Sequence, residues 1–122
     1  MSGRSSRNKG AAGEREVLKL LGEELGVILQ RNLQQTRSGG ADCIELKGFA
    51  LEVKRQESLS RPAWWRQACK QAEDLGKEPM LLYRRSREPW SAWIKTSDGH
   101  RECTLVEAAQ HIRETWLDVA SN

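Results

Sequence analysis

The chain of 122 residues has little of what extracellular and membrane proteins use. Its three cysteines, Cys43, Cys69 and Cys103, are odd in number and widely spaced, with no Cys-x-x-Cys pair. This excludes a disulfide framework and indicates a reducing compartment. No apolar run approaches the roughly 20 residues of a membrane span. The basic segment 1–10 has no apolar stretch behind it, so we expect neither a membrane helix nor a secretory signal, and we predict a cytoplasmic location.

Three common kinds of site are also missing. Both histidines lie in the last quarter of the chain, so no Ser/His/Asp arrangement stands out. His100 and Cys103 have no Cys-x-x-Cys pair to complete a zinc site, and the other two cysteines would come from separate elements, so we expect no zinc. Gly39-Gly40 lacks the following Lys and Ser or Thr of a phosphate-binding loop.

What the sequence does have is an uneven distribution of charge. The net charge is +3, from 20 basic and 17 acidic residues. Residues 1–13 hold three basic residues and no acid, and residues 54–87 hold nine basic and four acidic residues. From Asp98 onward, five acids face two basic residues. This polarity is expected of a chain that meets phosphate on one side, but charge alone does not separate nucleic-acid binding from a solvated surface of mixed sign.

The pattern of apolar and turn residues predicts a basic flexible arm at 1–10 and a single mixed α/β domain at 11–122. Gly26 and Gly76 are natural helix ends, and Thr104 and Glu107 form a capping box that opens a last helix. The predicted elements are a helix at 11–25, strands at 27–29, 41–46 and 49–56, a helix at 60–75 with Ser60 as its cap and Pro62 in its first turn, strands at 80–84 and 90–95, and a helix at 104–119.

In the predicted first helix, one acidic residue is aimed inward. On a wheel of about 100° per residue, four apolar residues fall in one narrow sector, with Glu14 in the middle of it: Val17, Leu18, Leu21 and Leu25. Glu16 falls on the opposite side, where a first-turn acid that complements the helix dipole explains it. We therefore expect Glu14 to point toward a partner and Glu16 to face solvent.

The strands at 41–46 and 49–56 read as a hairpin that gathers charged residues. Alternation places Glu52 and Lys54 on the face opposite Leu51. If the turn is centred on Lys47, Asp42 lies directly opposite Glu52, with Cβ atoms about 5 Å apart. Two opposed carboxylates favour a cation, and hard oxygen ligands suit Mg²⁺ or Mn²⁺. The alternative is an exposed Glu–Lys pair with Asp42 as a turn residue.

Together these residues resemble the PD-(D/E)XK nuclease superfamily. Its α-β-β-β-α-β core resembles the predicted order, with an extra strand and a C-terminal helix added. Gly39–Asp42 and Leu51–Lys54 resemble its bipartite active site, although Ala41 stands where the family usually has Pro. Residues 7–16 are similar to the opening of archaeal-type Holliday junction resolvases, in which the first Glu of a Glu-Arg-Glu run is catalytic; that residue is Glu14 here.

The resemblance implies a restriction-endonuclease-like domain that hydrolyses DNA with Mg²⁺ or Mn²⁺. A Gln on the helix after the Lys strand often faces the site in small phage members, and of Gln67 and Gln71 we favour Gln67. The implied catalytic residues are Glu14, Asp42, Glu52, Lys54 and Gln67, and the implied metal ligands are Glu14, Asp42, Glu52 and the Val53 carbonyl. The expected DNA contacts are Arg4, Arg7, Lys9, Arg15, Arg37, Ser38, Arg55, Arg61 and Arg66.

The expected function is cleavage of a four-way DNA junction by a phage- or prophage-type Holliday junction resolvase, in the cytoplasm of a bacterial host. The alternatives are a nuclease acting on another DNA structure and a non-catalytic DNA-binding module of the same fold. Two symmetric cuts need two sites, so we expect a homodimer, formed through Trp90 and Trp93 or through the last helix around Trp116. Trp64 and Trp93 are most simply core residues, whereas Trp65, Trp90 or Trp116 could stack on bases or lie in an interface.

Overall fold

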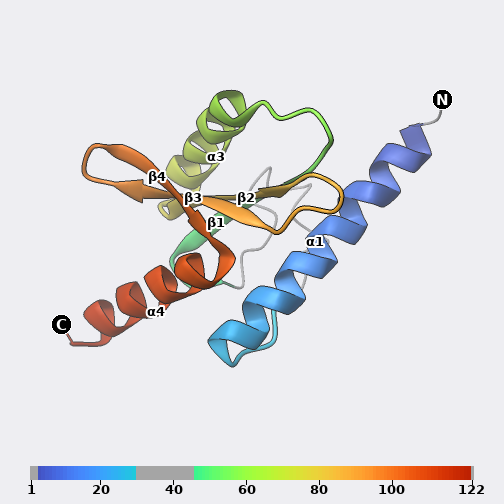
Figure 1. Cartoon of the computed structure of the whole chain (residues 1–122). Coiled ribbons are helices and arrows are strands. Elements are labelled where there is room, and N and C mark those ends of the chain that lie inside the picture. The colour runs from blue at the N-terminus through green and yellow to red at the C-terminus, as the bar shows by residue number, and fades with distance from the viewer. Residues whose placement is uncertain (1–2, 30–45, 122) are drawn as a thin grey trace.

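The computed structural model describes residues 3–29 and 46–121 (Figure 1). The elements are α1 (Gly3–Leu25), β1 (Phe49–Arg55), α3 (Arg61–Leu75), β2 (Glu78–Arg84), β3 (Ser91–Thr96), β4 (Gly99–Thr104) and α4 (Leu105–Ser121). The four strands form one sheet in the order β1-β2-β3-β4. β1 and β2 are parallel, and the other neighbours are antiparallel. The predicted α/β class is confirmed.

The helix α3 makes the crossover that two parallel neighbouring strands require. Pro62 lies in its first turn, where the missing N–H costs nothing, and Gly76 ends it in the left-handed conformation at φ 66°. Ser60 occupies the cap position as predicted, but its side chain makes no capping hydrogen bond. The two ends of α3 are therefore set by proline and glycine rather than by the Ser60 hydroxyl.

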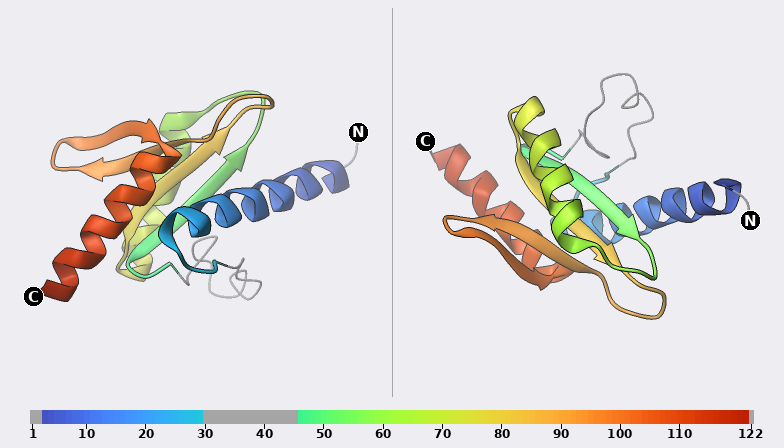
Figure 2. Two further views of the ribbon diagram at one scale, coloured as in Figure 1. Left: turned by 60° about the horizontal axis from the view of Figure 1, so that its bottom comes forward. Right: turned by 90° about the horizontal axis from the view of Figure 1, so that it is seen from above.

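Helices cover both faces of the sheet, with α1 and α4 on one side and α3 on the other (Figure 2). Phe49 and Leu51 of β1 pack with Val17 of α1 in the main core. Ala50 points the other way and packs against Ala72 of α3. β1 is thus covered on both faces, and a polar side chain in its middle has no easy route to water.

The start of α4 is fixed by the predicted capping box. The Thr104 N–H donates to Glu107 Oε1 at 2.9 Å, and the Glu107 N–H donates to Thr104 Oγ1 at 3.1 Å. Each side chain satisfies a backbone donor that the first helical turn leaves open. This exchange confirms that the helix begins directly after Thr104.

Three elements differ from the prediction by more than one or two residues at an end. α1 begins at Gly3 rather than at residue 11, because no proline or stop signal interrupts the segment, so the flexible arm at 1–10 stays a prediction. Residues 27–29 form no strand; the Val27 N–H instead donates to the Gly22 carbonyl at 3.0 Å and closes the end of α1. β4 was not expected, since Gly99–Thr104 is charged and exposed and is held by its pairing with β3.

Of the predicted strand at 41–46, residues 41–45 lie outside the described residues, and Leu46 lies in a bend before β1. None of the helices that the structure describes is both long enough and apolar enough to cross a membrane.

Candidate active site

Glu52 is the one charged side chain that is buried in the part of the chain that the structure describes, with 4% of its surface exposed. It lies in the middle of β1, which is covered on both faces. Burial raises the pKa of the Glu52 carboxyl above its ordinary value, because a charge is costly to remove from water. A nearby cation is therefore needed to stabilise the ionised form of the Glu52 carboxyl.

Lys54 supplies one cation. Its Nζ lies 3.4 Å from Glu52 Oε2, and its side chain is half-buried. The ammonium lowers the pKa of Glu52, but the effect of burial is larger. Ala50 faces α3 and Leu51 faces the main core, so Glu52 and Lys54 share the face opposite Leu51, as alternation predicts.

Glu14 approaches from α1. Its side chain is half-buried, and the nearby Val17 and Leu18 are buried in the main core, in the sector that the helical wheel predicts. The negative charge of Glu14 raises the pKa of Glu52 further, which places the two carboxylates within electrostatic reach of each other. Glu14 and Lys54 thus both influence the charge of Glu52, from two elements that are distant in sequence.

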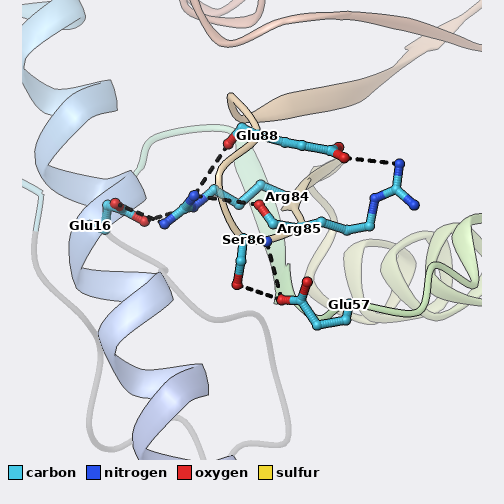
Figure 3. Close-up of polar contacts among 6 residues, drawn as sticks. All are labelled: Glu16, Glu57, Arg84, Arg85, Ser86 and Glu88. Carbon is cyan, nitrogen blue, oxygen red and sulfur yellow. Dashed lines mark hydrogen bonds and ion pairs between the residues drawn. The ribbon is translucent and has the colours of Figure 1, made fainter.

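Glu16 is partly open to solvent, as predicted, but it also has a partner that was not expected. Its side chain is 40% exposed and pairs with Arg84 at the end of β2, with Arg84 Nε 3.1 Å from Glu16 Oε1 (Figure 3). Because α1 begins at Gly3, Glu16 lies in the middle of the helix, and a first-turn dipole effect does not explain it. The two residues are 68 positions apart, and no local sequence pattern connects them.

Several other predicted site residues lie outside the described residues. These are Asp42, Arg37 and Ser38, together with the side chains of Arg4, Arg7 and Lys9. Val53 lies between Glu52 and Lys54, and its side chain packs against the main core. Gln67 is exposed on α3, whereas Gln71 on the same flank is half-buried. The roles of all these residues stay predictions.

The remaining predicted DNA contacts differ in how they are held. Arg15 and Arg66 are exposed on α1 and α3. Arg55 is half-buried, and its Nε has no hydrogen-bond partner among the described residues. Arg61 is already engaged, because its Nη1 donates to Glu102 Oε1 at 3.2 Å. Binding a phosphate through Arg61 would compete with that ion pair, so Arg15 and Arg66 are better placed for the role.

The tryptophans mostly serve the core. Trp64, Trp90 and Trp93 are buried, which confirms the core role predicted for Trp64 and Trp93. His100 stacks on the Trp93 indole, with ring centroids 3.8 Å apart and planes at 12°. His100 is thereby occupied as an aromatic cover over a core side chain.

The acids of the site suit a hard divalent cation. Glu14 and Glu52 offer carboxylate oxygens. Burial raises the pKa of Glu52 by more than the Lys54 ammonium lowers it, so the Glu52 charge is only partly compensated. Within residues 3–29 and 46–121, no group of three His, Cys, Asp or Glu side chains could hold a metal ion. Asp42, the third predicted acid, lies outside that part of the chain. Oxygen donors with an excess of negative charge fit Mg²⁺ or Mn²⁺.

Comparisons with known proteins identify the family and the fold. The family described as "Phage putative PDDEXK endonuclease" matches residues 5–118, so the chain belongs to this family. Among solved structures, the chain is similar to Hjc of Archaeoglobus fulgidus, a Holliday junction resolvase from an archaeal hyperthermophile, with a TM-score of 0.55 and 18% identity over 81% of this chain and 97% of that one. The likeness confirms the restriction-endonuclease-like fold. No curated protein sequence matched the chain.

Proposed function

We propose that this chain is a metal-dependent endonuclease that hydrolyses phosphodiester bonds in branched DNA, acting as a Holliday junction resolvase of phage or prophage type. Its family is one of PDDEXK endonucleases. The observation that carries the chemistry is the buried Glu52 carboxylate, with Lys54 at 3.4 Å and Glu14 within electrostatic reach. Burying a carboxylate is costly, and a metal site accounts for that cost more directly than DNA binding alone.

The proposed roles follow from the chemistry of the side chains. Glu14, Asp42 and Glu52, with the Val53 carbonyl, would hold Mg²⁺ or Mn²⁺. A divalent cation bound there supplies Lewis acidity at the scissile phosphate and lowers the pKa of bound water. Lys54, held in place by its contact with Glu52, orients the attacking water or neutralises the charge that develops on the phosphate.

The substrate proposal rests on charge and on likeness. Arg15 and Arg66 are exposed cations that would hold phosphates without reading bases, which suits an enzyme that selects DNA by shape. The similarity to an archaeal Holliday junction resolvase supports a four-way junction as that shape.

Cutting two strands symmetrically needs two copies of the site, and we propose a homodimer. Trp90 and Trp93, one of the two predicted interfaces, are buried within the subunit. On α4, Val106 is 54% exposed and Leu117 is 66% exposed. Eleven helical residues bring the chain back to about the same side of the helix, so these two apolar side chains share one face. The interface proposal therefore falls on α4.

A cleavage assay tests the function. Labelled four-way, three-way, single-stranded and linear duplex DNA are each incubated with the protein and Mg²⁺, with Glu52→Gln as the matched variant. Paired cuts near the branch of the four-way junction, absent with Glu52→Gln, would support the proposal. Equal cleavage of linear duplex would identify a nuclease for another DNA structure, and no cleavage of any DNA with Mg²⁺ or Mn²⁺ would identify a binding module.

A further inference from the structure

The guanidinium of Arg84 joins α1 to the loop between β2 and β3 (Figure 3). Toward α1 it forms a two-pronged ion pair, with Nε 3.1 Å from Glu16 Oε1 and Nη2 3.4 Å from Glu16 Oε2. Toward the loop, Nη1 donates to the carbonyl oxygens of Arg85 at 3.4 Å and Glu88 at 3.2 Å. Every nitrogen of the group is engaged and 13% of the side chain is exposed, so its orientation is fixed.

The loop that holds Arg84 is itself anchored. The Ser86 N–H and hydroxyl both donate to Glu57 Oε2, at 3.1 Å and 2.6 Å, which ties the loop to the segment that follows β1 (Figure 3). Arg85 and Glu88 form an ion pair across the loop at 3.0 Å. Arg84 therefore presents its guanidinium to α1 from a rigid support.

A second contact fixes α1 one turn before Glu16. A Cβ atom on Gly13 would lie 3.0 Å from the Cβ of Arg55, so the helix backbone rests directly on the end of β1. Arg55 is the register partner of Arg84 on the neighbouring strand. Residues three apart lie on one side of a helix, so α1 is held against β1 and β2 at two adjacent points.

Along the chain, Glu14 lies between Gly13 and Glu16, and Glu52 lies three residues before Arg55 on β1. α1 also packs on the sheet through apolar side chains, Val17 and its neighbours in the main core. Apolar packing turns the buried stripe of α1 toward the sheet, and the two-pronged ion pair adds a directional contact that restricts how α1 is rotated and shifted along the strands.

We propose that the Glu16–Arg84 ion pair is the positioning device of the candidate active site: it sets the register of α1 so that Glu14 presents its carboxylate beside Glu52 for a divalent cation. Glu16 is then a positioning residue rather than a catalytic one. The inference rests on the proposed function, because it assigns Glu14 and Glu52 to one cation. Groups that orient metal ligands typically change metal affinity by about 10- to 100-fold when they are removed.

The test measures Mn²⁺ binding to the metal-free full chain without DNA, from the loss of the electron paramagnetic resonance signal of free Mn²⁺. Glu16→Gln keeps the side-chain size but removes the ion pair, and should weaken Mn²⁺ binding by about 10-fold. Glu23→Gln, the same change at an exposed position of α1, is the matched control and should bind as wild type. Gly13→Ala should also weaken binding, because its methyl group pushes α1 away from Arg55.

A double-mutant cycle separates positioning from general loss of stability. If Glu16 acts through Glu14, Glu16→Gln should cause no further loss of Mn²⁺ binding in a Glu14→Gln background. A purely structural role would give the same loss in both backgrounds and would overturn the proposal. Arg84→Lys keeps the charge without the two-pronged geometry and should give an intermediate loss of Mn²⁺ binding. If urea denaturation shows that Glu16→Gln is not stably folded, Arg84→Lys tests the proposal in its place.

The outcomes distinguish this inference from the proposed function. In one outcome, Glu14→Gln and Glu52→Gln weaken Mn²⁺ binding whereas Glu16→Gln and Arg84→Lys leave it unchanged. That outcome overturns the positioning role alone. A wild-type chain that binds no Mn²⁺, or binds it equally well without Glu14 and Glu52, overturns the metal site and the positioning role together.

Discussion

The Lys54 ammonium lies 3.4 Å from the Glu52 carboxylate, and yet burial still raises the pKa of Glu52 above its ordinary value. The Lys54 charge therefore does not fully compensate the cost of burying the Glu52 carboxylate on β1. A position used only for packing is often equally or more stable with an apolar residue of similar size. A retained buried acid beside a lysine is instead expected where a cation or a phosphate completes the arrangement.

Replacing Glu52 by Gln should remove cleavage and leave DNA binding intact. Losing about 4 kcal/mol of transition-state stabilisation slows cleavage by about 1,000-fold, and the exposed basic residues that hold phosphate are elsewhere. Single-turnover cleavage and gel-shift titration on a four-way junction measure the two effects. Glu73→Gln, at an exposed position of α3, is the control and should cleave as wild type. Unchanged cleavage by Glu52→Gln would remove Glu52 from the site.

The same variant should change how stability depends on pH. A carboxyl with a raised pKa in the folded state contributes stability that is fully present below its ordinary pKa of 4.5. That stability is lost as the pH rises through the pKa of the folded state. The amide of the Glu52→Gln variant does not ionise, so its free energy of unfolding has no such pH-dependent loss. The free energy of unfolding of Glu52→Gln minus that of wild type should therefore be constant below the ordinary pKa and increase as the pH rises above it.

Urea denaturation of the metal-free proteins, from about pH 4 to about pH 8, measures this difference. Glu107, whose pKa is lowered by hydrogen bonds from Thr104, affects both proteins equally and cancels. A difference that shrinks as the pH rises would mean that Lys54 outweighs burial at Glu52.

The parts of the site that depend on local periodicity could be predicted from the sequence. Strand alternation placed Glu52 and Lys54 opposite Leu51, and the helical wheel placed Glu14 beside the buried stripe of α1. Glycine chemistry likewise placed the end of α3 at Gly76. The two-residue repeat of a strand and the 3.6-residue repeat of a helix are enough to determine which way a side chain points. The left-handed conformation of one glycine is enough to determine where a helix ends.

The remaining features depend on contacts that no local repeat encodes. The pairing of Glu16 with Arg84 joins positions 68 apart and exists only once α1 packs across the end of β2. β4 is polar and exposed, and the antiparallel ladder with β3 makes it a strand despite its composition. Ser60 occupies the cap position without capping, because tertiary packing and Pro62 suffice to start α3.

Arg66 and Arg61 lie on the same helix but should respond differently to replacement by Ala. Arg66 is exposed, and losing one phosphate contact should reduce the dependence of log Kd on log salt concentration by about 0.9. Arg61 is paired with Glu102, so Arg61→Ala should mainly cost stability, by less than about 1 kcal/mol for so exposed a pair. Binding titrations at several salt concentrations check both, with Arg101→Ala on β4 as the control. Equal salt slopes for wild type and Arg66→Ala would exclude Arg66 from the DNA surface.

Leu117→Glu should dissociate the proposed homodimer without unfolding the subunit. Leu117 is 66% exposed, so a charge there costs the monomer little, whereas a two-fold axis near it would bring two like charges together. Losing a central contact of about 2 kcal/mol weakens association by about 30-fold. Sedimentation equilibrium should show the shift, and the monomeric variant should nick one strand of a junction where the dimer makes paired cuts. Leu20→Glu on α1, at 36% exposure, is the control and should stay dimeric. A wild-type chain that sediments as a monomer, both alone and bound to a four-way junction, would contradict the dimer and leave α4 without this role.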